Sequence, residues 1–500
     1  MAARTEVETA DTGISRVGVS PLLLLLAGSG LVFMTFMRFS LPEVAWVAFA
    51  PFLVFLHERG TIRRHFALLA TLLVAFLLAV SKMDTAEIPW APVPGFAVPL
   101  AVSYFVALAA AGLAHRRLGA RWGPYTFASM AAALGWVQYT FTPGSSWGVL
   151  AHTQLENLPL VQLAALTGVS GITLLVAFGS GLAAAAWSSS VKVVRVDIAV
   201  YGVLLGSALL YGQLRLGHAA PGKLLRIGGL VSPVTHAEFR AAYQNVDTLR
   251  LLDDELFARS NRAVDLGARI VVWPEIATLV TRVSEPDVVA RGEALAKTRG
   301  VALLMAYGLF DTAQPTPRSL YVNKYRFFGP DGSLLDEYVK RHPVPVDPNP
   351  AGTAHARVVT IDGVAVSGGI CYDYGFPEIA RDNANDGASV ALVPSSDWRG
   401  IDPEHGRMAL MNAVAVGLPM VRPVRAATSI ATDQYGRLLY SLGADADGDG
   451  VMVVAVPTER VSTLYARTGE ILPLLALVFG VFVMIRAWRS HPPSETVRSA

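Results

Sequence analysis

The stretch VAVSGGICYDYGFPEIARDNANDGASVALVPSSD, residues 364–397, predicts a β-strand, an α-helix and a second β-strand in succession. Both strands are short apolar runs, and the polar segment between them is long enough for a helix. The stretch contains Cys371, the single cysteine of the 500-residue chain. Because free cysteine is among the most buried residue types, Cys371 can be a core residue or a nucleophile, and this stretch alone leaves both interpretations open.

The same alternation of strands and helices continues on both sides of this unit, between residues 223 and 468. We predict a first strand at 224–232, a long helix at 235–268 and a strand at 269–275. Residues 321–342 predict a hairpin around a Pro-Asp-Gly turn. Strands that alternate with helices indicate an α/β domain, and the length of this segment suits one domain.

Three of the predicted strands end in side chains that together could carry out acyl transfer. Glu275, Lys340 and Cys371 each end a strand. A nearby lysine lowers the pKa of a thiol, and a carboxylate can take the thiol proton and later activate a second nucleophile. Lysine and a backbone N–H can hold the developing oxyanion. Singly, Glu275 could be a strand-end cap and Lys340 a surface charge, so only the combination indicates catalysis.

The N-terminal part of the chain predicts a membrane domain at residues 21–214. The chain is 53% hydrophobic and only 16% charged, whereas a soluble domain has about 25% charged residues. Seven apolar runs of bilayer-spanning length follow one another with short connections, and an eighth lies at 470–487. The seven runs are 21–38, 41–57, 65–82, 94–115, 124–141, 164–187 and 197–214. Buried core helices would not explain so many consecutive runs.

Lys and Arg concentrate in alternate connections, at 57–65, 115–123 and 188–197, and after residue 487. The positive-inside rule therefore predicts cytoplasmic tails at 1–20 and 488–500 and an extracytoplasmic domain at 223–468. The N-terminal tail lacks the pattern of a cleavable signal peptide. The net charge of +2 gives no indication of nucleic-acid binding.

The segments WPE, YVKRH and GGICYD, in this order, are similar to the Glu-Lys-Cys signatures of the nitrilase superfamily. With seven predicted helices before this domain and one after it, the chain resembles the apolipoprotein N-acyltransferase family. Residues 145–175 also resemble the segment that leads into the later membrane helices of that family. The resemblance implies a four-layer αββα sandwich and a location in the bacterial inner membrane, with the catalytic domain on the periplasmic side.

The resemblance also implies an acyltransferase reaction without a cofactor. A fatty acyl chain passes from a phospholipid to the cysteine as a thioester, and then to the N-terminal amine of the diacylglyceryl-cysteine of a lipoprotein. Glu275 matches the general base, Lys340 the oxyanion lysine and Cys371 the nucleophile. Tyr372 matches the residue whose backbone N–H meets the oxyanion, and Asp373 stands where the family usually has glutamate.

Several positions depart from the family pattern. The usual second glutamate after the lysine is replaced by Pro348, and Asp347 is the nearest carboxylate, which could take over its role or be a solvated loop residue. The segment between Lys340 and the cysteine is shorter than the usual apolar arm. Asn412 and Ala415 stand where Arg and Glu are usual, PVRAATS replaces an Asn-rich strand, and the first strand lacks the usual Gln-Gly-Asn.

Two other functions fit the sequence: a membrane-tethered amidase of the nitrilase type, favoured by the short arm, and a catalytically inactive membrane scaffold, disfavoured by the intact triad. The sequence DADGDG at 445–450 lacks the closing glutamate of a calcium loop and indicates a turn. His342 and His405 are isolated histidines, so we expect no metal site and a structural role for His405. Trp147 is predicted to be an interface anchor and a candidate lipid contact.

Overall fold

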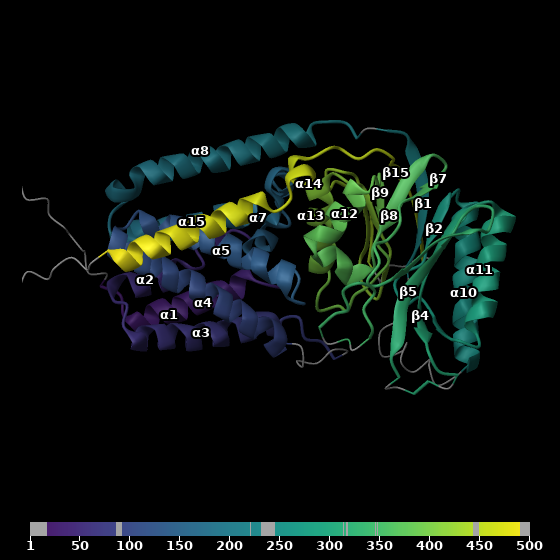
Figure 1. Ribbon diagram of the computed structural model, residues 1–500, viewed down its shortest axis with the longest axis horizontal. Coiled ribbons are helices and arrows are strands. Elements are labelled where there is room, and N and C mark those ends of the chain that lie inside the picture. Colours follow the sequence, from purple (N-terminus) through teal and green to yellow (C-terminus); the bar gives the residue numbers. More distant parts are fainter. Residues whose placement is uncertain are drawn as a thin grey trace, which may run out of the picture.

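The computed structural model describes residues 18–490, apart from 87–92, 221, 232–245, 314, 317–318, 346, 348 and 444–449. A helical region forms one end of the elongated molecule, and an α/β region forms the other (Figure 1). The first part of the predicted helix at 235–268 and nearly all of the DADGDG sequence lie outside the described residues.

The helical region contains eleven short and long helices among the described residues. They are α1 (Pro21–Thr35), η1 (Val44–Trp46), α2 (Ala50–Glu58), α3 (Ile62–Ser81), α4 (Val93–Leu118), α5 (Trp122–Phe141), η2 (Leu150–Gln154), α6 (Leu158–Val161), α7 (Ala164–Ser188), α8 (Val191–Leu216) and α15 (Ile471–Arg489). Five of them, α3, α4, α7, α8 and α15, are long and apolar enough to cross a membrane. The borders and the number of membrane spans stay predictions.

The continuous helix predicted at 41–57 is broken in the structure. The chain forms η1, leaves the helix at Val47 and starts again at α2. Pro51 lies in the first turn of α2, where its missing N–H costs no hydrogen bond and its fixed φ favours a helix start. The hydropathy pattern does not register this break because both pieces are apolar.

α7 lies at the centre of the helical region and is mostly buried. Its many Ala, Gly and Ser residues let neighbouring backbones approach closely. A Cβ atom added at Gly181 would lie 2.6 Å from the Cα atom of Pro124 in the first turn of α5, so only glycine allows this contact. By contrast, α8 runs along the outside of the region and is largely exposed (Figure 1).

The α/β region contains two stacked sheets, and each carries helices on its outer face (Figure 1). The first sheet has the order β15 (Val451–Pro457), β1 (Leu224–Leu230), β2 (Ile270–Val272), β4 (Ala302–Phe310), β5 (Tyr321–Phe328), β6 (Leu334–Val339), with β3 (Leu279–Thr281) beside β4. The second has the order β14 (Leu438–Leu442), β13 (Ser429–Thr432), β11 (Met420–Arg422), β9 (Val390–Leu392), β8 (Val364–Gly368), β7 (Val359–Ile361). The short strands β10 (Ser395–Ser396) and β12 (Val424–Arg425) form a separate pair.

The helices complete a four-layer αββα sandwich, as predicted. α10 (Val246–Asp265) and α11 (Glu285–Arg299) cover the first sheet, and α12 (Pro377–Asn385) and α13 (Glu404–Val416) cover the second (Figure 1). One apolar cluster fills the space between the sheets, and it includes Ile270 from β2 and Leu392 from β9. A second cluster lies between the first sheet and its helices.

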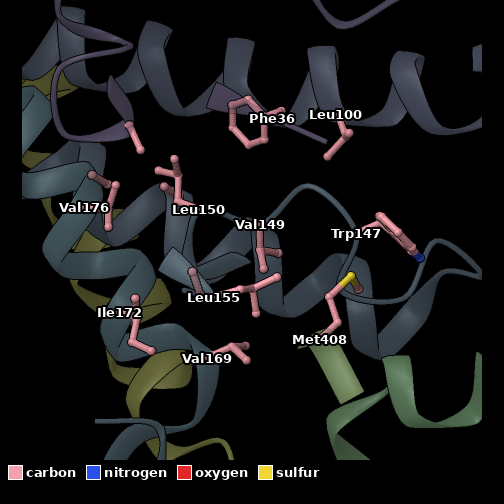
Figure 2. Packing of buried hydrophobic residues seen from close by; sticks show 14 of the residues in the cluster. Phe36, Leu100, Trp147, Val149, Leu150, Leu155, Val169, Ile172, Val176 and Met408 are labelled. Atoms are coloured by element: carbon pink, nitrogen blue, oxygen red, sulfur yellow. The ribbon is translucent and has the colours of Figure 1, made fainter. Parts of the chain in front are cut away.

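The α12–α13 layer also packs on the helical region (Figure 1). α7 contacts α13 and α14 (Leu464–Thr468), and one continuous apolar cluster crosses the junction. Figure 2 shows Met408 of α13 close to Trp147 and Val149, which belong to the loop between α5 and η2. The two regions therefore share a hydrophobic core, and the ends of the second sheet lie near that loop.

Candidate active site

Glu275 and Lys340 form a buried ion pair at the ends of two strands of the first sheet. Lys340 Nζ donates to Glu275 Oε1 at 2.7 Å, and each side chain is only 3% exposed. Asn323 Nδ2 donates to the same oxygen at 2.7 Å. The N–H of Lys340 also bonds to the carbonyl of Asn323, so the β5–β6 hairpin brings both donors to the carboxylate. The paired carboxylate is thus fixed in position by two donors.

Cys371 follows β8 of the second sheet and begins the short helix η3 (Cys371–Gly375). Its φ of 52° is uncommon for a residue with a side chain and marks a sharp strand-to-helix turn. The N–H of Cys371 donates to the carbonyl of Pro394 at 2.9 Å. Its thiol lies 3.6 Å from Asp397 Oδ1 and 3.7 Å from the carbonyl of Ser396. The turn therefore holds the thiol against the segment that follows β9.

Four charged groups act on the thiol. Burial and the charges of Glu275 and Asp397 hold the Cys371 pKa well above its usual range, although Lys340 and Arg422 oppose this effect. Burial alone would lower the Lys340 pKa, but the charges of Glu275 and of an ionised Cys371 raise it. The lowering of the thiol pKa by Lys340 is the effect expected from the sequence, but burial outweighs it. Burial therefore favours the protonated thiol, which lies near the Glu275–Lys340 ion pair.

Asp373 anchors the segment after β6 to η3. Its carboxylate accepts from the N–H of Ile370 at 2.9 Å, from the hydroxyl of Tyr338 at 2.8 Å and from the N–H of His342 at 2.8 Å. Lys340 lies between Tyr338 and His342 in sequence, and Cys371 follows Ile370. The three bonds therefore hold Lys340 and Cys371 in fixed relative positions. A direct role of Asp373 in the reaction stays a prediction.

Tyr372 joins η3 to the helical region. Its hydroxyl donates to the carbonyl of Pro143 at 2.9 Å, and its side chain is buried. This contact fastens the loop between α5 and η2 to the site. The expectation that the backbone N–H of Tyr372 meets an oxyanion stays a prediction.

Asp347 turns back on its own loop, where its carboxylate accepts from the N–H and the side-chain amide of Asn349. Burial raises the Asp347 pKa, and the charge of Lys340 opposes this effect. Asp347 therefore lies within electrostatic range of the Glu275–Lys340 pair. Pro348, which stands at the family's usual glutamate position, lies outside the described residues.

Trp147 is only 2% exposed, so it is not an exposed anchor at a lipid interface. Its ring centroid lies 5.8 Å from that of His405 on α13. The side chain packs in the core between the two regions (Figure 2). Hydropathy could not distinguish a membrane interface from a buried junction, because a large aromatic residue near the end of a helix is common in both.

Asp397 and Arg422 form a second buried ion pair that sequence reasoning missed. Arg422 Nη2 donates to both carboxylate oxygens of Asp397 at 2.8 and 3.0 Å, and each side chain is 1% exposed. Burial alone would raise the Asp397 pKa, but Arg422 and His405 lower it well below its usual range. Two features of the sequence could have identified this pair. Asp397 follows a predicted strand, as Glu275 does, and Arg422 lies within the apolar run PMVRPV.

One ligand atom from each of Cys371, Asp397 and His405 lies within 4.8 Å of the others, an arrangement that could hold a metal ion. The guanidinium of Arg422, however, sits on both oxygens of Asp397. Its permanent positive charge repels a metal cation at this place. The chemistry of the donor set therefore disfavours a metal here.

The two sheets with their outer helices define a carbon–nitrogen hydrolase domain of the nitrilase type, which is joined to a helical membrane region. Residues 240–466 match the carbon-nitrogen hydrolase family, and residues 28–182 match the apolipoprotein N-acyltransferase N-terminal domain. Together the two matches cover most of the chain. The chain belongs to the apolipoprotein N-acyltransferase family, of which it is a divergent member.

Relatives that align with most of this chain carry the same family name. The apolipoprotein N-acyltransferase of Rhodopseudomonas palustris is 28% identical over 79% of this chain and 79% of its own. That of Azotobacter vinelandii is 26% identical over 95% of this chain and 93% of its own. A solved amidase of the nitrilase superfamily from Nesterenkonia is 21% identical over 48% of this chain and 94% of its own, with a TM-score of 0.37.

Proposed function

We propose that the protein transfers a fatty acyl chain from a membrane phospholipid, through a thioester on Cys371, to the N-terminal amine of a diacylglyceryl-cysteine in a lipoprotein. The observation that carries the proposal is the buried Glu275–Lys340 pair next to the thiol, in a family of N-acyltransferases. The shared core of the catalytic and helical regions supports a lipid substrate, because it keeps the thiol close to the membrane part of the molecule.

In the first half-reaction Glu275 takes the thiol proton while the sulfur of Cys371 attacks the ester carbonyl of the phospholipid. The C–S bond forms, the ester C–O bond breaks, and the proton passes from Glu275 to the departing lysophospholipid oxygen. The ammonium of Lys340 stabilises the negative carbonyl oxygen in the transition state. Burial raises the thiol pKa and so favours the protonated form, which is why the attack calls for a base that takes the proton.

In the second half-reaction the amine of the lipoprotein attacks the thioester carbonyl, the C–N bond forms and the C–S bond breaks, while a proton leaves the amine nitrogen and the departing sulfur takes one up. Lys340 again faces the developing oxyanion, because both half-reactions pass through the same carbonyl carbon. The products are an amide and the free thiol of Cys371.

The catalytic domain at 223–468 lies on the periplasmic side of the inner membrane in this proposal, with both tails in the cytoplasm. The support is the alternation of basic connections along the helical region. Reporter fusions near residues 118 and 300 should give opposite signals. Equal signals from both positions would contradict this topology.

The experiment that tests the function uses the purified full-length protein with phospholipid in mixed micelles. Intact-mass spectrometry should show an added acyl group that maps to Cys371 and that disappears when a lipoprotein-derived peptide with a diacylglyceryl-cysteine is added. Hydrolysis of a small amide without any acyl adduct would refute the proposal.

A further inference from the structure

His405 in the first turn of α13 lies beside the thiol. It is 1% exposed, and its Nδ1 lies 2.8 Å from Asp397 Oδ1. A ring nitrogen of His405, an oxygen of Asp397 and the sulfur of Cys371 all lie within 4.8 Å of one another. The other ring nitrogen, Nε2, is buried and has no hydrogen-bond partner among the described residues.

An unpaired buried nitrogen calls for an explanation, because burying such a group without a partner costs about 1–3 kcal/mol. A substrate group that reaches Nε2 during the reaction would provide the partner.

The neighbours of His405 determine which nitrogen carries the proton. Asp397 is ionised beside Arg422, so its carboxylate can only accept. Arg422 also lies 3.1 Å from Nδ1, but a guanidinium can only donate. The shorter contact, at 2.8 Å to Asp397, therefore needs a hydrogen on Nδ1. With this hydrogen on Nδ1, Nε2 is the ring nitrogen that can accept a proton, as in other sites where a carboxylate orients a histidine base.

Two aromatic rings from different parts of the chain lie near the imidazole. The ring of Trp147, from the helical region, is 5.8 Å away between centroids, and that of Tyr372, from η3, is 6.1 Å away. His405 thus lies at the junction of the catalytic and helical regions. A lipid-linked peptide on its way to Cys371 has to meet both regions, because its acyl chains belong to the membrane and its amine must reach the thioester.

We propose that Nε2 of His405 takes the proton from the acceptor amine in the second half-reaction, which deepens the proposed function and rests on it. The amine nitrogen attacks the thioester carbonyl and passes its proton to Nε2. As the C–S bond breaks, its electron pair goes to sulfur, and the proton moves from Nε2 to Sγ and restores the thiol. Asp397 stabilises the transient imidazolium. Glu275, with one oxygen held by two donors, serves the first half-reaction.

The variant His405→Asn tests this assignment. Its side-chain amide can still donate to Asp397 from about the place of Nδ1, whereas Nε2 is removed. In single-turnover experiments we expect thioester formation on Cys371 to stay within about threefold of wild type. Transfer to the peptide amine should fall about 10²–10⁴-fold, the range for loss of a general base, and the acyl-enzyme should accumulate.

Hydroxylamine distinguishes a general base from a structural role of His405, because a structural defect would slow both nucleophiles alike. Hydroxylamine is a small α-nucleophile that cleaves thioesters rapidly without an enzymic base, so it should deacylate the acyl-enzymes of wild type and His405→Asn at rates within a few-fold of each other. The matched control is His355→Gln, which alters an exposed histidine of the same domain. It should match wild type in both half-reactions.

Three results would overturn the assignment: amine transfer by His405→Asn within tenfold of wild type, equal losses in both half-reactions, or an equal loss with hydroxylamine. His405→Gln is measured alongside, and if neither variant forms a thioester, His405 acts before the second half-reaction and the assignment is wrong. Failure of the wild-type protein itself to form a thioester would instead refute the proposed function.

Discussion

The variant Glu275→Gln separates the two contributions of the buried carboxylate, which are pairing with Lys340 and accepting the thiol proton. Glutamine keeps an oxygen that can accept from Lys340 and Asn323, but it carries no charge. With the carboxylate charge gone, burial becomes the main influence on Lys340 and lowers its pKa.

The expected magnitudes follow from the burial of the pair. Breaking a buried ion pair costs about 3–5 kcal/mol of folding free energy. The retained acceptor oxygen and the lowered pKa of Lys340 place this variant near the lower limit. Losing the proton acceptor slows thioester formation about 10²–10⁴-fold. At about 1.36 kcal/mol per tenfold, this equals about 3–5 kcal/mol of activation free energy.

The assay measures thioester formation by intact mass after rapid mixing with phospholipid micelles, and thermal unfolding of the same preparations. The matched control is Asp362→Asn, which removes an exposed carboxylate paired with Arg269 at 2.7 Å. The control should lose at most about 1 kcal/mol and keep its rate. A folded Glu275→Gln protein that forms the thioester within tenfold of the wild-type rate would refute the role of Glu275 as the thiol base.

Three further outcomes follow from the site. Cys371→Ser should show no acyl adduct by intact mass, and an acyl adduct elsewhere on this variant would contradict the thioester. Asp347→Asn should slow thioester formation about tenfold or more, through the lost charge near Lys340, and unchanged single-turnover rates would place Asp347 outside the site. Burial raises the Glu404 pKa to about 7. Protonated Glu404 contributes to the stability of the folded protein, and the contribution is complete below the pKa that this carboxyl has in the unfolded chain. The contribution is lost as the pH rises through 7. Glu404→Gln should therefore raise Tm by a few degrees at pH 8 but not at pH 4, as measured by scanning fluorimetry, and equal shifts at both pH values would contradict this cause.

The strand-end residues could be predicted because each depends on a local pattern. Glu275, Lys340 and Cys371 each follow a short apolar run, and their order along the chain matches a known signature. The alternation of strands and helices predicted an α/β domain, whereas the stacking of two such sheets was implied only by the family resemblance. What the local pattern could not supply is the net pKa of the thiol, because it depends on how deeply the two sheets bury it.

The Asp397–His405–Arg422 cluster depends on contacts between distant segments. Asp397 follows β10, Arg422 ends β11, and His405 belongs to the helix that connects them. They converge because β11 pairs in parallel with β9, which returns the chain to the same edge of the sheet. No spacing within one strand or one helix predicts that return. Trp147 is a similar case, since its partner, α13, lies in the other region of the molecule.

In the proposed mechanism the two buried ion pairs act together on a thiol whose pKa is raised by burial. One pair, Glu275–Lys340, comes from the first sheet, and the other, Asp397–Arg422, comes from the second; both act on Cys371. Buried ion pairs contribute little net stability, so their presence here is better explained by orientation than by folding energy. Because each pair is neutral as a whole, neither supplies an excess positive charge that would hold a thiolate permanently. In the proposed mechanism Cys371 then ionises only as a base takes its proton and as the sulfur attacks a carbonyl that Lys340 can polarise. The reactive thiolate is thereby restricted to the moment when substrate is bound.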